Sequence, residues 1–349
     1  MIGRLLTVLS VAYPLAPVGP DAVGGAEQVL SAVDQALVSA GHRSVVVAQE
    51  GSAVAGELHG VPRPAGALDD AARAAAEADT AREVRAALRG GRVDAVHLHG
   101  IDFPAYLPPP GPPALVTLHL PPSWYPAAAL RPSRPATWLH GVSASQHAAL
   151  LDARAAPLLQ PVPNGVPVEA LGAARHARRS FALVLGRVCP EKGQRHALVA
   201  AHAADVPLLI GGEVYPYPDH ERYFAEEMAP LLDRRRRFLG PVGFARKRRL
   251  LAAARCVLVP STAPETSSLV AMEAAACGTP VVAFRSGALP EVVEHGRTGF
   301  LVADAAGMAE AIGRAGDLDP DAIRRVARAR FSQARMAGAY LALFRRLAA

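Results

Sequence analysis

The chain has 349 residues, of which 51% are hydrophobic and 19% are charged. That length suits about two domains, and the composition excludes a disordered or collagen-like chain. Lys and Arg outnumber Asp and Glu by 37 to 31, and the net charge of +6 suits anionic ligands. No zinc-finger, helix-turn-helix or single-strand-binding signature is present, so no nucleic acid partner is expected. Three cysteines without paired or metal-ligand spacing favour a reducing compartment, the cytoplasm.

The first apolar segment, residues 5–11, predicts a buried strand of a parallel sheet. A signal peptide over residues 1–13 is the alternative, but no small-residue cleavage site follows cleanly. No uninterrupted stretch of about 20 apolar residues occurs, so no membrane span is predicted.

Short apolar segments alternate with helical patterns along almost the whole chain, which is typical of βαβ units. We predict an α/β fold of two Rossmann-like domains, residues 1–170 and 171–334, with linker composition at 171–180. A long helix is expected at 25–40, and a final helix at about 335–349 is expected to pack back onto the first domain. The expected strands are residues 5–11, 44–48, 95–98, 114–118 and 139–143 in the first half, and 181–186, 207–210, 237–239, 256–259 and 280–283 in the second.

Two Pro-rich stretches, residues 103–113 and 121–135, follow strands of the first half. Proline suits neither a helix interior nor a central strand, so both are predicted to be loops. Ligands bind at the carboxyl ends of strands in open α/β sheets, so these loops are candidates for shaping a substrate site. Plain connecting loops are the alternative.

The segment around Glu265 predicts a phosphate-binding turn. A strand leads into a loop that carries Glu265, and a helix is expected over residues 267–278. The backbone N–H groups of Ser268, Leu269 and Val270 would then lie at a helix N-terminus, where hydrogen-bond donors and the helix dipole stabilise a phosphate.

Two glutamates accompany that turn. Glu273 lies one turn into the helix, roughly 6 Å along its axis from Leu269, which is near enough to hydrogen-bond a ribose. Glu265 lies before the first turn, where a carboxylate suits sugar hydroxyls and would repel a bare phosphate.

This segment resembles the family 4 retaining glycosyltransferases of the GT-B fold, also called glycosyl transferases group 1. The resemblance implies two Rossmann-like domains facing each other across a cleft, with the nucleotide-sugar donor on the second domain and the acceptor on the first. The seven residues between Glu265 and Glu273 fit the family, and one such pair would be weak without the ordered motifs around it. These motifs are at residues 24–27, 162–166, 186–193, 274–282, 287–293 and 296–302.

The resemblance assigns roles to further residues. Arg187 and Lys192 would neutralise the donor diphosphate, which gains negative charge as the glycosidic bond breaks. Gly24 and Gly25 would let the backbone approach the diphosphate or the sugar, with a simple turn as the alternative. His119, at a strand end, matches a histidine of the sugar site, with a structural histidine as the alternative. The expected catalytic residues are therefore His119, Arg187, Lys192 and Glu265.

One departure from the family's motif leaves the identity of the donor sugar open. The family commonly has Gly at the position of Ser268, and a side chain there narrows the sugar pocket or adds a hydroxyl. The sequence does not reveal the nucleobase of the donor either. A UDP- or GDP-linked sugar is expected. His97 and His99 alternate onto one strand face, but no third ligand is placed and no zinc is assigned. No metal and no cofactor are expected, because the basic residues and the helix N-terminus already supply a positive field.

The remaining basic residues predict solvent-exposed faces. The runs at 234–237 and 246–249 are interpreted in this way. Arg82, Arg85 and Arg89 form a stripe on a helix of the first domain, which leaves an anionic acceptor or peripheral contact with a membrane surface open.

We therefore predict a retaining glycosyltransferase that moves a sugar from a nucleoside-diphosphate sugar to an acceptor hydroxyl of a glycan, lipid or secondary metabolite. A nucleotide-sugar 2-epimerase of the same fold is an alternative, but it needs acid/base carboxylates in the first domain that the sequence does not identify. A non-catalytic sugar-nucleotide binder is disfavoured because the donor motifs are intact. A dinucleotide-dependent oxidoreductase would need GxGxxG after the first strand.

Overall fold

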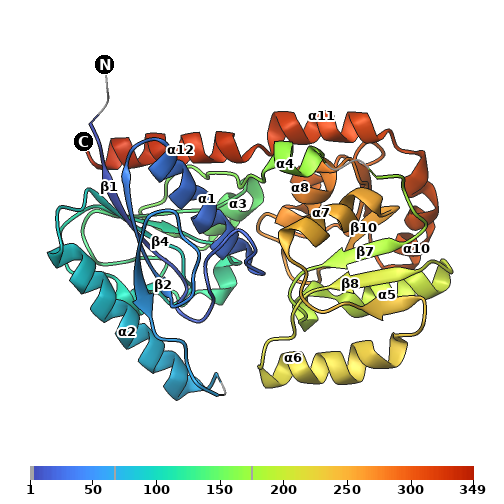
Figure 1. Ribbon diagram of the computed structural model, residues 1–349, viewed down its shortest axis with the longest axis horizontal. Helices are drawn as coiled ribbons and strands as arrows, with labels where there is room; N and C mark the ends of the chain where they lie inside the picture. The colour runs from blue at the N-terminus through green and yellow to red at the C-terminus, as the bar shows by residue number, and fades with distance from the viewer. Residues whose placement is uncertain (1–3, 67, 174–175) are drawn as a thin grey trace. The chain divides into compact units, whose positions relative to one another are not determined.

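The computed structural model describes residues 4–66, 68–173 and 176–349, which form two compact units (Figure 1). The first unit comprises Met1–Pro163 and Ala334–Ala349, and the second comprises Asn164–Gln333. Residue 170, the expected boundary, falls inside the second unit. Residues 1–3, which begin the alternative signal peptide, and residues 174–175 of the expected linker lie outside the described residues. No helix among the described residues combines the length and the apolar character that a membrane span needs.

The first unit is built on a parallel six-stranded sheet in the order β3-β2-β1-β4-β5-β6. Successive residues of its strands face opposite sides: Val45 and Val47 pack with Val84 of one helix, and Val46 packs with Leu30 of another. Both faces of the sheet are therefore covered. The elements are β1 (Thr7–Val11), α1 (Gly25–Ser39), β2 (Arg43–Gln49), β3 (Glu57–Val61), α2 (Asp70–Arg89), β4 (Ala95–Leu98), β5 (Ala114–Thr117), β6 (Thr137–His140), α3 (Ala144–Asp152) and the final helix α12 (Gln333–Leu347).

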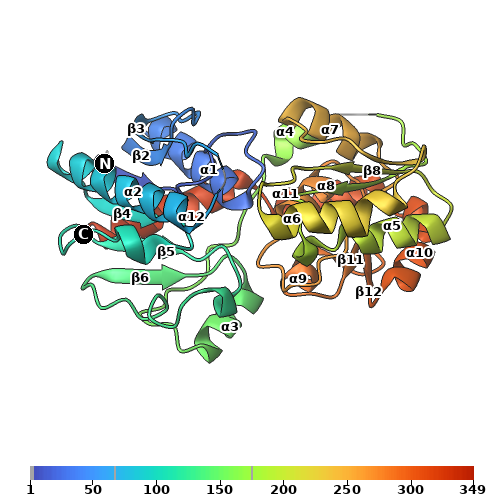
Figure 2. The ribbon, with the colours of Figure 1, turned by 90° about the horizontal axis from the view of Figure 1, so that it is seen from below.

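The second unit repeats this arrangement in the order β12-β11-β10-β7-β8-β9, and Figure 2 shows its helices along the sheet. Counted within each unit, both sheets have the 3-2-1-4-5-6 order of a Rossmann fold. The elements are α4 (Val168–Gly172), β7 (Ala182–Leu185), α5 (Gln194–Ala203), β8 (Leu208–Gly211), α6 (Pro218–Arg222), β9 (Arg236–Phe238), α7 (Phe244–Ala253), β10 (Cys256–Val259), α8 (Leu269–Ala276), β11 (Val281–Phe284), α9 (Leu289–Val292), β12 (Gly299–Val302), α10 (Ala305–Arg314) and α11 (Pro320–Arg330).

Most predicted strands are confirmed, and β4 and β10 have the predicted bounds. The edge strands β3 and β12 were not predicted. The expected strand at 139–143 is wrong in its second half, because β6 ends at His140. Ser143 instead caps α3, where its side-chain oxygen accepts a hydrogen bond from the Gln146 N–H at 3.2 Å.

The two Pro-rich stretches are mostly loops, as predicted, but each begins with a short 3₁₀ helix, η1 (Phe103–Tyr106) or η2 (Pro122–Trp124). The buried Arg134 guanidinium ties them together. It donates hydrogen bonds to the carbonyl oxygens of Pro108 at 2.7 Å and Pro112 at 2.8 Å. These loops therefore have fixed positions beyond the carboxyl ends of β4 and β5.

Candidate functional site

Three loops pack tightly at the carboxyl edge of the second sheet, after β7, β10 and β11. Gly193 and Gly287 both have positive φ, at +64° and +53°. A Cβ on Gly193 would lie 2.3 Å from the Pro260 oxygen, and one on Gly287 would lie 2.1 Å from the Glu265 oxygen. The Ala288 N–H donates to that Glu265 oxygen at 2.7 Å. Glycine is thus required at both contacts, and the backbone of Glu265 is held in place.

Glu265 and Lys192 are in direct contact. Lys192 Nζ donates to Glu265 Oε1 at 2.6 Å, and Ser261 Oγ donates to the same oxygen. The Glu265 side chain is only 8% exposed, against 37% for Lys192. Burial raises the pKa of Glu265, but the ammonium, the hydroxyl and the more distant Arg187 charge outweigh it, so the pKa is lowered. Glu265 is therefore held as a carboxylate beside a cation.

Arg187 lies on the same loop as Lys192, directly after β7, and its side chain is half-buried. Gln194 Nε2 donates to the Arg187 carbonyl oxygen at 2.8 Å, which fixes the loop to the start of α5. The structure thus brings Arg187, Lys192 and Glu265 together at one edge of the sheet.

The helix that follows Glu265 begins later than expected. α8 starts at Leu269 rather than Ser267 and ends at Ala276 rather than Gly278. Ser268 precedes its first residue in a left-handed conformation, with φ 64° and ψ 73°. The Ser268 carbonyl accepts hydrogen bonds from the N–H groups of Ala271 and Met272, at 3.1 and 3.3 Å. This left-handed turn, which sequence patterns do not reveal, delays the helix.

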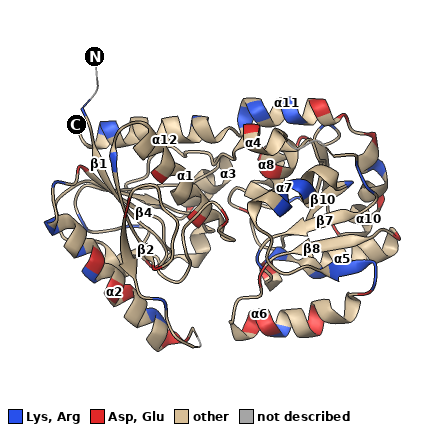
Figure 3. Cartoon of the chain, in the orientation of Figure 1, with Lys and Arg blue, Asp and Glu red and all other residues tan. Residues whose placement is uncertain are grey.

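Glu273 lies within α8 and contacts Lys247 of α7 at 2.5 Å. The Glu273 side chain is buried, at 3% exposure, and the Lys247 side chain is mostly covered, at 12% exposure. The interpretation of 246–249 as a solvent-exposed run is therefore wrong at Lys247, although basic residues do cover α7 (Figure 3). Arg236 is a second correction, because it is buried and pairs with Asp233 at 3.0 Å.

Composition contains a signal that sequence reasoning missed. Of the 37 basic residues, only Lys192 and Lys247 are lysines. Each contacts one of the two site glutamates, Glu265 or Glu273. A lysine ammonium is a compact point charge, unlike the planar arginine fork. The two lysines in an arginine-rich chain therefore mark positions where a compact cation fits against a buried carboxylate.

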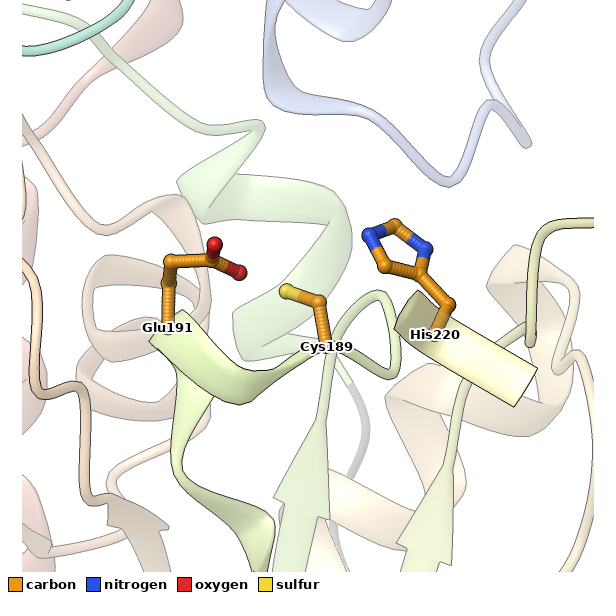
Figure 4. Close-up of side chains that lie close together, drawn as sticks. All are labelled: Cys189, Glu191 and His220. Carbon is orange, nitrogen blue, oxygen red and sulfur yellow. The ribbon is translucent and has the colours of Figure 1, made fainter. Parts of the chain in front are cut away.

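A second cluster combines two residues of the loop after β7 with one residue of α6. Among the residues that the structure describes, Cys189 Sγ, a Glu191 carboxylate oxygen and a ring nitrogen of His220 lie within 4.8 Å of one another (Figure 4). These groups suit a zinc-like ion. However, burial raises the pKa of the Cys189 thiol, and burial and the Arg187 charge lower the pKa of His220. The neutral thiol and nearby guanidinium oppose a bound cation. His220 was not singled out in the sequence.

His119 lies in the first unit, in the loop after β5. Its N–H and that of Leu120 donate to Tyr125 Oη at 3.1 and 3.3 Å. Gln146 Nε2 donates to the carbonyl oxygens of Leu118 and Leu120 at 2.8 and 2.9 Å. The backbone around His119 is therefore fixed from both sides.

His97 and His99 lie on one face, as predicted. With His119 they form a series of three imidazole rings within hydrogen-bond distance of one another. A ring nitrogen of His99 lies 2.9 Å from His119 Nε2, and the other lies 3.1 Å from His97 Nδ1. Burial lowers the pKa of His97 and His99 well below its usual value and that of His119 to about 3. All three imidazoles are therefore neutral at pH 7.

The other expected residues also lie in the first unit. Gly24 caps α1 with an ordinary φ of −81°, and Gly25 begins the helix. A Cβ on Gly24 would lie 1.9 Å from a Glu27 carboxylate oxygen, so the close approach there is to a side chain. The stripe at Arg82, Arg85 and Arg89 is exposed on α2, and Arg82 pairs with Asp79.

Comparisons with known proteins identify the family to which the chain belongs. Residues 23–170 match Glycosyltransferase Family 4, and residues 179–316 match Glycosyl transferases group 1. A D-inositol 3-phosphate glycosyltransferase of Corynebacterium glutamicum is 40% identical over 129 residues, which is 34% of this chain and 30% of that protein. The match thus spans about a third of the length of such curated relatives.

Solved structures match over nearly the whole chain. AviGT4, a glycosyltransferase involved in avilamycin A biosynthesis, has a TM-score of 0.70 and 26% identity, with 98% of each chain covered. Anabaena HepE, solved with UDP and glucose, has a TM-score of 0.72 and 21% identity, covering 97% of this chain and 99% of that one. With its two Rossmann-like sheets and matched segments over most of its length, the chain belongs to the family 4, group 1 glycosyltransferases of the GT-B fold.

Proposed function

We propose that this protein is a retaining glycosyltransferase that moves a sugar from a UDP- or GDP-linked donor to an acceptor hydroxyl. The contact between Lys192 and Glu265, beside Arg187, carries this proposal. The two cations suit a diphosphate that gains charge as it leaves, and the carboxylate suits hydroxyls of the transferred sugar.

The start of α8 supplies the remaining donor contacts. The N–H groups of Ser268, Leu269 and Val270, with the helix dipole, bind a phosphate. Glu273, held by Lys247, accepts a hydrogen bond from the ribose through its carboxylate. UDP is the first nucleotide to test, because HepE, which shares this fold, was solved with UDP and with UDP-glucose.

The mechanism follows from these charges. Arg187, Lys192 and the α8 N-terminus stabilise the leaving diphosphate, so transfer proceeds without a metal ion. The diphosphate then takes the acceptor proton on the face that it leaves, and the anomeric configuration is retained.

The first unit receives the acceptor in this proposal, with His119 at the transferred sugar and Gly24 and Gly25 near the donor. The acceptor is a glycan, lipid or secondary metabolite of the cytoplasm. D-inositol 3-phosphate is one candidate, taken from the names of curated relatives. The exposed arginines of α2 support contact with an anionic acceptor or a membrane surface.

A ligand panel tests this function directly. UDP, GDP and ADP are compared by thermal shift, where a ligand at 100 times its Kd stabilises the protein by about 2.7 kcal/mol. The matching donor sugar is then incubated with and without acceptors in EDTA, and NMR of the product reads its anomeric configuration. Conversion without an acceptor would indicate an epimerase. An inverted product, or activity that returns only with added Mg²⁺ or Mn²⁺, would contradict the proposed mechanism.

The two glutamates should separate nucleotide from sugar recognition. Glu273→Gln should weaken UDP binding by about 1.5 to 3 kcal/mol, because a charge-assisted bond to the ribose is lost. Glu265→Gln should leave UDP affinity near that of the parent while sugar transfer falls. The exposed Glu310→Gln on α10 serves as the control for both measurements. Equal losses of UDP affinity in the two site variants would show that Glu265 serves the nucleotide or the fold.

A further inference from the structure

A row of polar side chains is buried in the first unit. His97 of β4, Thr117 of β5 and His140 of β6 are each 0% exposed. Thr117 and His140 are paired in the sheet register. Tyr340 and Phe344 of α12 lie over His97, with ring centroids at 5.2 and 5.3 Å. Buried polar groups are costly unless each is hydrogen-bonded, so these contacts define the chemistry of the row.

Hydrogen-bond distances connect the row to His119. His119 Nε2 lies 2.9 Å from His99 Nδ1, and His99 Nε2 lies 3.1 Å from His97 Nδ1. His97 Nε2 lies 2.7 Å from Thr117 Oγ1. Thr117 Oγ1 lies 2.6 Å from His140 Nε2. We call His140, Thr117, His97 and His99 the polar row.

The far end of the polar row sets the direction of its hydrogen bonds. His140 Nδ1 lies 2.9 Å from the Gly141 carbonyl oxygen, which can only accept, so this nitrogen carries a proton. Burial lowers the pKa of His140 to about 4, so the ring is neutral and its Nε2 is an acceptor. Thr117 therefore donates its one hydroxyl hydrogen to His140. Its oxygen must then accept from His97 Nε2–H, and its second lone pair faces the Tyr340 hydroxyl at 3.3 Å.

The same reasoning continues to His119. His97 is neutral and protonated at Nε2, so its Nδ1 accepts from His99 Nε2–H. His99 Nδ1 must then accept from His119 Nε2–H. His119 consequently carries its proton on Nε2 and has an acceptor lone pair at Nδ1. The rings of His99 and His119 are also stacked, with planes 15° apart.

We propose that the polar row is a positioning device that fixes His119 in its Nε2-protonated tautomer, so that its Nδ1 is a hydrogen-bond acceptor. The opposite tautomer would present an N–H donor at the same place. The row therefore sets the hydrogen-bonding character of His119 at the proposed sugar site, and this last role rests on the proposed function.

Imidazole ¹⁵N NMR of the full chain tests the tautomer, because protonated and unprotonated ring nitrogens resonate in well-separated ranges. The parent should show His119 protonated at Nε2 and unprotonated at Nδ1. Thr117→Val has nearly the same shape but lacks the hydroxyl, so the Gly141 end no longer sets the direction and the His119 signals should move toward the other tautomer. Thr117→Ser should restore the parent signals. Tyr340→Phe should leave the His119 tautomer unchanged, because its hydroxyl adds only a side contact to Thr117.

Turnover is measured on the same proteins. Thr117→Val should lower kcat by about tenfold or more, with little change in KM for the donor, since a wrong histidine tautomer disables catalysis in other enzymes. Thr117→Ser should recover kcat. His119 protonated at Nδ1 in the parent, or unaffected by Thr117→Val, would overturn the proposal. A switched tautomer with unchanged kcat would overturn its catalytic purpose. Failure of the proposed function would give a different result. The parent would then transfer no sugar, although its His119 signals would be as expected.

Discussion

The candidate site has two lysine–glutamate pairs among the described residues. The pair of Lys247 and Glu273 is the more buried one, with side chains 12% and 3% exposed. A buried ion pair adds little net stability over apolar residues, because both charges are removed from water. Loss of one partner is different, since it leaves an uncompensated charge in the interior. The pair therefore makes the position of Glu273 depend on a residue of another helix.

Lys247→Met should destabilise the protein by about 3 to 5 kcal/mol, because Glu273 loses the cation that it contacts while it stays buried. Arg249→Met is the matched control, an exposed residue of the same helix, and should change stability by less than about 0.5 kcal/mol. Urea denaturation measures both. Similar small changes in the two variants would mean that Glu273 does not need Lys247.

Asp102 is a further residue with unusual electrostatics. Its Oδ1 accepts a hydrogen bond from Tyr106 Oη at 2.6 Å, and its Oδ2 is buried without a partner among the described residues. Burial raises the pKa of Asp102 from 3.8 to about 6. The folded state thus holds this proton more tightly than the unfolded state. The resulting stability is complete below about pH 4 and is lost as the pH rises through about 6.

Asp102→Asn should consequently gain stability over the parent as the pH increases. The asparagine keeps an acceptor for Tyr106 but never ionises. The difference in unfolding free energy should grow by on the order of 2 kcal/mol between about pH 4 and pH 7. Melting temperatures across this range measure it, with the exposed Asp152→Asn as control. A difference independent of pH would show that Asp102 ionises normally.

At the scale of elements, the turn into α8 combines a strained residue with the proposed phosphate site. Ser268 has a φ of 64°, which is unfavourable for any residue with a Cβ. The neighbouring Ser267 hydroxyl is buried without a hydrogen-bond partner among the described residues. Such strain persists where the surrounding structure enforces it, and it is typical of binding sites.

Ser268→Gly should stabilise the protein by about 1 kcal/mol, since glycine adopts positive φ without this cost. Ser268→Ala keeps the Cβ and should bring no gain. Thermal unfolding followed by circular dichroism compares the three proteins. Loss of stability in the glycine variant would show that the serine hydroxyl contributes more than the strain costs.

At the scale of the whole molecule, the chain leaves the first unit after Pro163 and returns to it at Ala334. The returning segment is α12, which Figure 1 shows in red at the C-terminal end of the chain. Its Tyr340 and Phe344 are fully buried, and both rings pack on His97. The first unit is therefore complete only when the end of the chain is in place.

Phe344→Ala should destabilise the first unit by about 3 to 5 kcal/mol, the usual cost of removing a buried aromatic ring. UDP affinity, which we assign to the second unit, should stay near that of the parent. Calorimetry measures both quantities on the full chain, and the exposed Arg346→Ala of the same helix is the control. A loss of UDP affinity that accompanies the loss of stability would show that nucleotide binding depends on the first unit.

Features that depend on local patterns could be predicted from the order of residues alone. Short, mainly apolar segments predicted β4 and β10 to their bounds, because strands buried on both faces are rich in apolar residues. The edge strand β3 was missed because it is not a buried, continuously apolar segment. β3 is exposed or half-buried at four of its five positions, and Gly60 weakens its strand pattern. The strand, loop and helix pattern likewise indicated Glu265, and the resemblance to the family indicated Arg187 and Lys192.

Only the tertiary structure decided which distant side chains meet. The strand β10 separates Lys247 of α7 from Glu273 of α8 along the chain, and their contact depends on how the two helices pack against each other. Alternation placed His97 and His99 on one face, but the strand order brings Thr117 of β5 against His97 and His140 of β6 against Thr117. Backbone periodicity is local and can be read along the chain, whereas pairing of buried polar groups depends on the folded topology.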